Sequence, residues 1–262
     1  MADVIARPGG ELASRPLHFF WVVDCSGSMW GEKIGVVNNA IQSVLPEMVD
    51  EAADNPNAQL MIRTLKFATG ASWVTESPVR VEDYAWEDLD AAGVTDLGKA
   101  FDLLSAQLDV KQMGERALPP VIVLLSDGQP TDDYKKSLTK FQKLPWAKKA
   151  VKIAISIGQD ADDDVLLEFT GNRELVLQAN NAKMLAKMIK WASTAVSAVS
   201  SGVSNTAEDR IQDTMPVLSD NGNGSAGSNG TPVPDNTHSA GNGPLILDMD
   251  NIPEPDDNDD VW

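Results

Sequence analysis

The chain has 262 residues, enough for one large domain or for one domain with an appendage. It carries 21 Lys and Arg against 39 Asp and Glu, and this formal charge of −18 argues against binding to nucleic acid or to anionic membranes. A single cysteine excludes an intrachain disulfide and favours a reducing compartment. No apolar run reaches the ~18–20 residues that span a bilayer, and the first ten residues lack the apolar core of a secretory signal. We therefore expect a cytoplasmic protein.

Short apolar runs without alternation are typical of strands that are covered on both faces of a parallel sheet. Such runs occur at residues 17–23, 121–125 and 151–157. Helical periodicity is found over residues 33–53, 95–108, from 131 onward, 162–170 and 181–199. Pro46 should kink or break the first of these helices, and Thr131 is the expected N-cap of the third.

Two further segments complete the predicted sheet. Residues 58–68 and 72–84 flank Gly70 and predict a hairpin, and residues 174–178 predict a short edge strand. The alternation of strands and helices indicates an α/β fold, a doubly wound and mostly parallel open sheet with one antiparallel strand.

Composition divides the chain into four parts. An N-terminal extension (1–14) precedes the α/β domain (15–200), which is followed by a flexible linker rich in Asn, Gly and Ser (201–243) and by an acidic terminal motif (244–262). From residue 211 to 262 there are ten acidic residues and no Lys or Arg, so this disordered acidic tail carries −10 of the total charge. The tail is open to several interpretations: a solvating segment, a docking motif, an autoinhibitory ligand, or a kinase substrate at residues such as Ser219, Ser225 and Thr231.

Polar side chains gather where the predicted strands end. The first strand ends in Asp24-Cys-Ser26-Gly-Ser28, the strand at 121–125 ends in Ser126-Asp127-Gly128, and the helix near 95 opens with Thr95. In open α/β sheets ligands bind outside the carboxyl ends of the strands, and carboxylate and hydroxyl oxygens suit a hard cation such as Mg²⁺ or Mn²⁺. With only two carboxylates, one coordination position should stay open for water or for an acidic side chain of a partner protein. Capping and turn residues at strand ends are the alternative explanation of the same pattern.

Three segments together resemble a von Willebrand factor type A (vWA) domain with a metal-ion-dependent adhesion site. They are Asp24-Cys-Ser-Gly-Ser-Met29, Thr95-Asp-Leu-Gly98 and Ser126-Asp-Gly-Gln-Pro-Thr-Asp132, and the likeness covers roughly residues 15–200. The resemblance implies a Rossmann-like fold and a metal site made by Asp24, Ser26, Ser28, Thr95 and Asp127. It departs from the family at Val94, where a second glycine is common, and in the acidic tail.

The segment Val22-Val-Asp-Cys-Ser-Gly-Ser-Met29 is followed by Gly31-Glu-Lys-Ile34. Together with short loops and the expected lack of a signal sequence, these residues resemble intracellular bacterial proteins of the TerY type within that family, which occur in tellurium-resistance and stress clusters. The resemblance implies a non-enzymatic adaptor that captures an acidic side chain of a partner, working with a Ser/Thr kinase and a metal-dependent phosphatase in a bacterial stress or defence system. The alternatives are a metal-assisted phosphoester hydrolase and a subunit that assists an AAA+ ATPase complex.

Other candidate sites are less consistent with the sequence. Cys25 is expected to be a small buried residue, and His18 a packed and hydrogen-bonded core residue. Residues 160–171 resemble a calcium loop, but Val165 stands where that loop needs glycine. Trp30 and Trp86 are candidate surface anchors for a partner.

Overall fold

The computed structural model describes residues 14–194, apart from residues 56–57, 115, 128 and 160. The predicted linker (201–243), the acidic motif (244–262), the turn at Gly128 and all but one residue of the extension (1–14) lie outside the described residues. Among the described residues, no helix is both long enough and apolar enough to cross a membrane.

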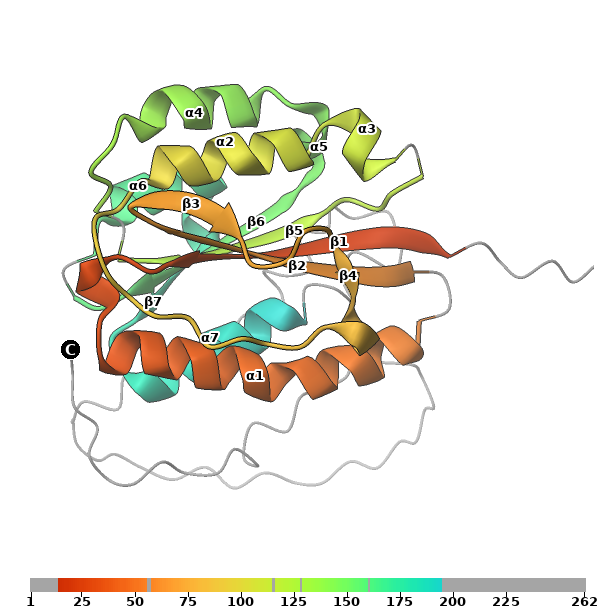
Figure 1. Ribbon diagram of the computed structural model, residues 1–262, viewed down its shortest axis with the longest axis horizontal. Helices are drawn as coiled ribbons and strands as arrows, with labels where there is room; N and C mark the ends of the chain where they lie inside the picture. Colours follow the sequence, from red (N-terminus) through yellow and green to blue (C-terminus); the bar gives the residue numbers. More distant parts are fainter. Residues whose placement is uncertain (1–13, 56–57, 115, 128, 160, 195–262) are drawn as a thin grey trace, which may run out of the picture. The chain divides into compact units, whose positions relative to one another are not determined.

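The described strands form one sheet with the spatial order β3-β2-β1-β5-β6-β7 (Figure 1), and β4 also pairs with β2. Their bounds are β1 Arg15–Asp24, β2 Ala58–Ala68, β3 Gly70–Trp73, β4 Val79–Arg80, β5 Val121–Ser126, β6 Val151–Ile157 and β7 Val176–Ala179. All neighbours are parallel except β3 and β4, which both run antiparallel to β2. The predicted fold class is confirmed, with the antiparallel strand present as two short pieces.

Helices cover both faces of the sheet (Figure 1). One face carries α1 (Glu32–Ala53) and α7 (Ala182–Ser193). The other carries α2 (Leu97–Gln107), α3 (Val110–Met113), α4 (Tyr134–Gln142), α5 (Pro145–Lys149) and α6 (Asp163–Thr170). Three 3₁₀ turns complete the described elements: η1 Gly27–Met29, η2 Val81–Asp83 and η3 Arg173–Leu175.

The two covered faces explain why the central strands are apolar without alternation. Phe19 and Trp21 of β1 pack in the core under α1 and α7, whereas Phe20 packs on the opposite face. There the rings of Phe101, Phe141 and Phe169 lie 5.7–6.1 Å apart and join α2, α4 and α6. Because both sides of β1 are buried, most of its positions hold apolar residues, which is the pattern that the sequence showed.

Two local details differ from the expectation. Pro46 does not break α1, which continues over 22 residues with Pro46 inside it. Pro46 and Gln42, whose carbonyl loses its helical partner, are both exposed, so water can bind that carbonyl. Helix α4 begins three residues after Thr131 and has Asp133 as its N-cap, because the Thr131 hydroxyl is already used in another hydrogen bond, which is described below.

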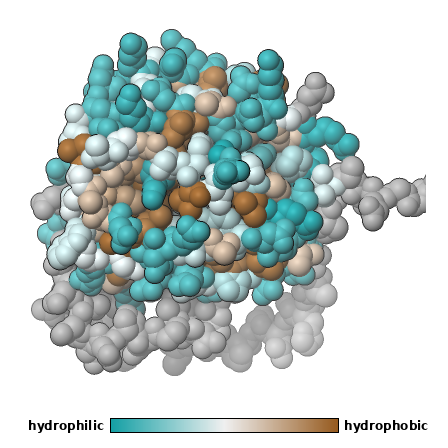
Figure 2. Space-filling model, viewed as in Figure 1, coloured by the Kyte–Doolittle hydropathy of each residue, from teal (hydrophilic) through white to brown (hydrophobic). Residues whose placement is uncertain are grey.

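The coloured surface in Figure 2 is mainly hydrophilic at the top of the view and along its lower margin. Apolar and neutral side chains gather in a band between α2 and α1, over β3 and the segment that follows it (Figures 1 and 2). This segment leads to Thr95, so it is part of the frame of the predicted site.

Candidate metal-binding site

The five predicted ligand residues lie on three loops at the carboxyl edge of the sheet. Asp24 is the last residue of β1, and Ser26 and Ser28 follow it in the turn toward α1. Asp127 follows β5, the parallel neighbour of β1, and Thr95 lies two residues before α2. In Figure 1 this edge is on the left, where the red segment joins β1 to α1.

Asp24 is fully buried, and both of its carboxylate oxygens accept hydrogen bonds. The backbone N–H of Ser26 donates to Oδ1 at 2.8 Å, and the hydroxyl of Ser126 donates to Oδ2 at 2.6 Å. Each carboxylate oxygen can accept a second bond, so Asp24 keeps acceptor capacity while its orientation is fixed. The turn after β1 and the end of β5 are thereby held together by one side chain.

The two serines turn toward each other, as the i, i+2 spacing predicted. Their Oγ atoms lie 3.0 Å apart, and either can be the donor. Ser26 is buried whereas Ser28 is exposed, so the pair runs from the interior to the surface. Two hydroxyl oxygens this close can serve one cation from adjacent positions.

Thr95 is held by reciprocal hydrogen bonds with Thr131, on the segment that follows β5. The backbone N–H of Thr95 donates to the Thr131 hydroxyl at 3.0 Å, and the backbone N–H of Thr131 donates to the Thr95 carbonyl at 2.8 Å. Both bonds use backbone groups of Thr95, so its side-chain hydroxyl takes no part in them. The loop before α2 is therefore fixed to the loop that carries Asp127.

Asp127 provides the observation that most directly indicates a missing ligand. Its side chain is buried, and among the described residues its Oδ1 has no hydrogen-bond partner. Its backbone carbonyl accepts from the N–H of Asp162 at 2.9 Å, so the loop itself is anchored. A buried and unpaired carboxylate oxygen costs about 1–3 kcal/mol or more, which a bound cation would recover. The donor set thus fits a hard divalent ion.

The electrostatics of the site also favour a cation. Burial raises the pKa of Asp24 above its ordinary value, and the nearby charge of Asp127 acts in the same direction. The hydrogen bonds from Ser126 and Ser26 oppose this rise in the pKa. Among the described residues no group of three or more His, Cys, Asp or Glu could hold a metal, so a cation here would depend on the hydroxyl oxygens as well as on the two carboxylates.

Close backbone approaches bring the loops together. The N–H of Gly27 donates to the carbonyl of Gly93 at 3.0 Å, and a Cβ on Gly27 would lie 3.2 Å from that oxygen. Gly93 has φ +89°, and a Cβ there would come within 2.4 Å of the Thr69 hydroxyl. Glycine at position 27 therefore relieves a tight contact, and glycine at position 93 provides both the space and the conformation that the loop needs.

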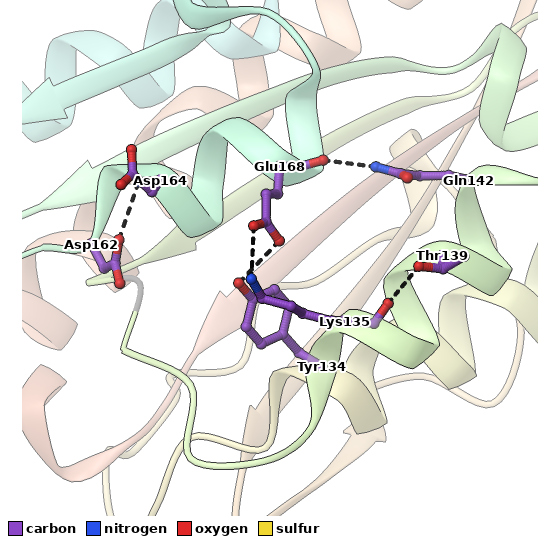
Figure 3. A network of polar contacts seen from close by, with 7 residues as sticks. All are labelled: Tyr134, Lys135, Thr139, Gln142, Asp162, Asp164 and Glu168. Atoms are coloured by element: carbon purple, nitrogen blue, oxygen red, sulfur yellow. Dashed lines mark hydrogen bonds and ion pairs between the residues drawn. The ribbon is translucent and has the colours of Figure 1, made fainter.

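A polar network joins α4, which follows the loop of Asp127, to α6, which follows β6 (Figure 3). Glu168 of α6 accepts from the Tyr134 hydroxyl at 3.0 Å and from Lys135 Nζ at 3.1 Å, and its backbone carbonyl accepts from Gln142 Nε2 at 2.7 Å. At the start of α6 the Asp162 side chain accepts from the N–H of Asp164 at 3.2 Å. The loop of Asp127 and the loop of Asp162, which are joined by a backbone hydrogen bond, thus lead into helices that are bonded to each other.

Other predicted features have mixed outcomes. Cys25 is buried, and burial raises its pKa to about 12, so the thiol has no nucleophilic character at neutral pH. His18 is packed against Phe20 as predicted, and its Nδ1 has no hydrogen-bond partner among the described residues. Trp30 is exposed, whereas Trp86 is partly buried against the core. Asp162, in the segment that resembles a calcium loop, is the N-cap of α6, and its side chain accepts from the N–H of Asp164.

Two residues of the site were not identified as such from the sequence. Ser126 orients Asp24, and its position directly before Asp127 gave no sign of this, because the contact depends on the register of β1 against β5. Thr131 was interpreted as a helix cap, and its hydroxyl instead fixes Thr95. That the five predicted ligands share one ion stays a prediction.

Comparison with solved structures finds the same fold in vWA proteins. The ArnB paralog VWA2 from Sulfolobus acidocaldarius is 19% identical with a TM-score of 0.51, and the match covers 68% of this chain and 45% of that one. A von Willebrand factor type A protein from Catenulispora acidiphila is 15% identical with a TM-score of 0.52, covering 69% and 42%. Proximal thread matrix protein 1 from the mussel byssus, solved with a zinc-occupied metal-ion-dependent adhesion site motif, is 16% identical with a TM-score of 0.51, covering 71% and 46%.

No family model and no curated protein matches the sequence. The chain spans less than half the length of each of the three solved proteins. At these identities the likeness concerns the fold, and the described part of the chain has the fold of a vWA domain.

Proposed function

We propose that this protein is a metal-dependent protein-binding module that holds Mg²⁺ or Mn²⁺ through Asp24, Ser26, Ser28, Thr95 and Asp127. The observation that carries the proposal is the buried Oδ1 of Asp127, which has no partner among the described residues. When bound, the ion supplies positive charge and an open coordination position to which a partner's carboxylate can bind.

Hydrogen bonds within the chain orient the proposed ligand residues without an ion or a partner. Ser126 and the backbone of Ser26 orient Asp24, and Thr131 holds the loop of Thr95. A preorganised donor set loses little conformational entropy when it binds a ligand. The exposed Ser28 places one oxygen of the set at the surface, where an incoming side chain would arrive.

We further propose binding rather than catalysis as the role of the site. Two residues that could act as nucleophile or base, Cys25 and His18, are poorly suited to either. Burial raises the pKa of Cys25 to about 12 and lowers that of His18 to about 4, and His18 lies in the middle of β1. Hydrolysis of a phosphoester would need a placed nucleophile or base beside the ion.

The finer proposal is a TerY-type adaptor in the cytoplasm of a bacterium. Its support is the likeness of residues 22–34 to TerY-type proteins. Its expected partners are a Ser/Thr kinase and a metal-dependent phosphatase of a stress or defence system. Such a partner would present an acidic side chain to the ion.

The test measures metal binding and partner capture on the same variants. We expect the full chain to bind one Mn²⁺, detected by electron paramagnetic resonance, and to retain its partner from a lysate of its source organism only without EDTA. Asp127→Ala, and Asp24→Ala combined with Ser26→Ala, should weaken both binding events more than tenfold. Asp133→Asn, which changes an exposed acid on the same segment, is the matched control. Capture that persists in EDTA and in both variants would refute the proposal.

A further inference from the structure

Two exposed apolar side chains flank the candidate metal site. Among the described residues only three large hydrophobic side chains are strongly exposed, and two of them are Trp30, at 77%, and Val94, at 45%. Trp30 lies two residues after Ser28, and Val94 directly precedes Thr95. We call Trp30 and Val94 the apolar rim of the site.

The rim is held in place by backbone hydrogen bonds. Its two loops are joined by the bond from Gly27 N–H to the Gly93 carbonyl at 3.0 Å. The N–H of Trp30 donates to the Gly27 carbonyl at 3.3 Å, and the N–H of Val94 donates to the Thr69 hydroxyl at 3.3 Å. A large exposed apolar side chain on a fixed backbone is the kind of residue that anchors a protein ligand.

A ligand that uses both the ion and the rim needs an acidic side chain with large apolar neighbours. The chain contains such a segment at residues 244–253, Pro-Leu-Ile-Leu-Asp-Met-Asp-Asn-Ile-Pro. In it Asp248 lies between Leu247 and Met249, and Asp250 follows Met249. Among the acids after residue 211, Asp248 alone lies between two large hydrophobic residues, and Asp256 and Asp257 have none beside them.

The length of the chain permits this contact. Residues 195–243 separate the described domain from the segment, and these 49 residues can span up to ~160 Å, whereas a domain of this size is ~40 Å across. A tethered segment experiences an effective concentration near the millimolar range, so a weak contact suffices.

The charge of the tail makes the contact depend on the ion. The region from residue 211 to 262 holds ten acids and no bases, and the site presents Asp24 and Asp127. Without a cation these charges repel, and with a divalent cation the site attracts a further carboxylate.

We propose that residues 244–253 of the same chain dock on the apolar rim, with Asp248 or Asp250 at the metal. The segment is then a built-in competitor of the external partner. This inference rests on the proposed function, because it uses the same ion and the same open position.

Paramagnetic broadening in the full-length chain tests the contact directly. Mn²⁺, compared with Mg²⁺, should broaden the amide resonances of residues 245–252 more than those of residues 225–235. This broadening should not change when the protein is diluted. Broadening around Ser26 and Thr95 without broadening of 245–252 would overturn this inference alone. Absence of broadening around Ser26 and Thr95 would overturn the proposed function with it. Broadening of 245–252 that fades on dilution would show that the segment docks on a second copy, which contradicts the intramolecular contact.

Competition gives an independent readout. A fluorescent peptide of residues 244–253, with Mg²⁺ present, should bind the full-length Asp248→Asn, Asp250→Asn variant about tenfold more tightly than the wild type, because that variant's own segment no longer competes. The matched control, Asp256→Asn with Asp257→Asn, should behave as the wild type does. Adding Trp30→Ala to the first variant should weaken peptide binding, and EDTA should abolish it. Equal peptide affinity for the wild type and the first variant would overturn the proposal.

Discussion

Asp127→Asn should stabilise the fold without magnesium and destabilise it, relative to the wild type, when magnesium is bound. In EDTA the variant lacks a buried charge whose Oδ1 is unpaired and which raises the pKa of Asp24, so its free energy of unfolding should equal or exceed that of the wild type. We expect a gain of about 1 kcal/mol, at the low end of the cost of an unsatisfied buried group. The amide that replaces the carboxylate is neutral and a poor ligand for Mg²⁺.

In Mg²⁺ at a hundred times its dissociation constant, the wild type should gain about 2.7 kcal/mol and the variant almost nothing. For a domain of this size that gain corresponds to about 5–10 °C in Tm. Thermal unfolding followed by circular dichroism, with and without Mg²⁺, should therefore show the two melting temperatures exchanging order. Asp133→Asn should follow the wild type in both buffers. An equal Mg²⁺ shift in Asp127→Asn and the wild type would refute the reasoning, as would no shift in either protein.

Three further predictions concern residues outside the ligand set. Burial lowers the pKa of His18 to about 4, below its value of about 6.5 in the unfolded chain. The stability that the neutral imidazole contributes is therefore complete above pH 6.5 and is lost as the pH falls toward 4. In urea titrations, His18→Leu should reduce the fall in free energy of unfolding between pH 7 and pH 4 by about 2–3 kcal/mol. Burial raises the pKa of Glu51 to about 7, so ionisation of this carboxyl destabilises the fold as the pH rises from 4.5 through 7. After allowance for solvent screening, Glu51→Gln should be about 1 kcal/mol more stable than the wild type at pH 8 and equal to it at pH 4. Equal stability of the two proteins at pH 8 would contradict the raised pKa of Glu51. Gly93→Ala should lower the free energy of unfolding by about 2–4 kcal/mol and weaken Mn²⁺ binding, because its Cβ would meet the Thr69 hydroxyl and the residue has a positive φ. Gly70→Ala is the control: its φ is +83° but its Cβ would lie in free space, so it should lower the free energy of unfolding by about 1 kcal/mol and leave Mn²⁺ binding intact.

The layers of the fold could be predicted from the sequence because burial on both faces leaves a direct trace. Trp21 and its neighbours in β1 are apolar on both sides of the strand, and the amphipathic stripe of α1 is visible despite Pro46. The helix continues because Pro46 lies on its exposed face, where the carbonyl that loses its helical partner can bind water. Local pattern gives the type of an element more securely than its continuity.

The contacts that shape the site could not be predicted because they join distant residues. Ser126 donates to Asp24 across 102 positions of sequence, and only the register of β1 against β5 brings them together. Asn38 of α1 bonds both the N–H and the carbonyl of Leu89, at 2.9 and 3.0 Å, and so holds the segment that leads to Thr95. That segment has no periodicity that a sequence pattern could show. The ligand types were therefore predictable, whereas the residues that position them were not.

Anomalous diffraction from crystals of the full chain grown with Mn²⁺ locates the ion and its ligands. We expect one strong peak at the carboxyl edge of the sheet, coordinated by oxygens of Asp24, Ser26, Ser28, Thr95 and Asp127, directly or through water. At least one coordination position should be filled by water or by a carboxylate from outside these five residues. A peak elsewhere, or an ion fully enclosed by the five side chains with no position left, would contradict this expectation.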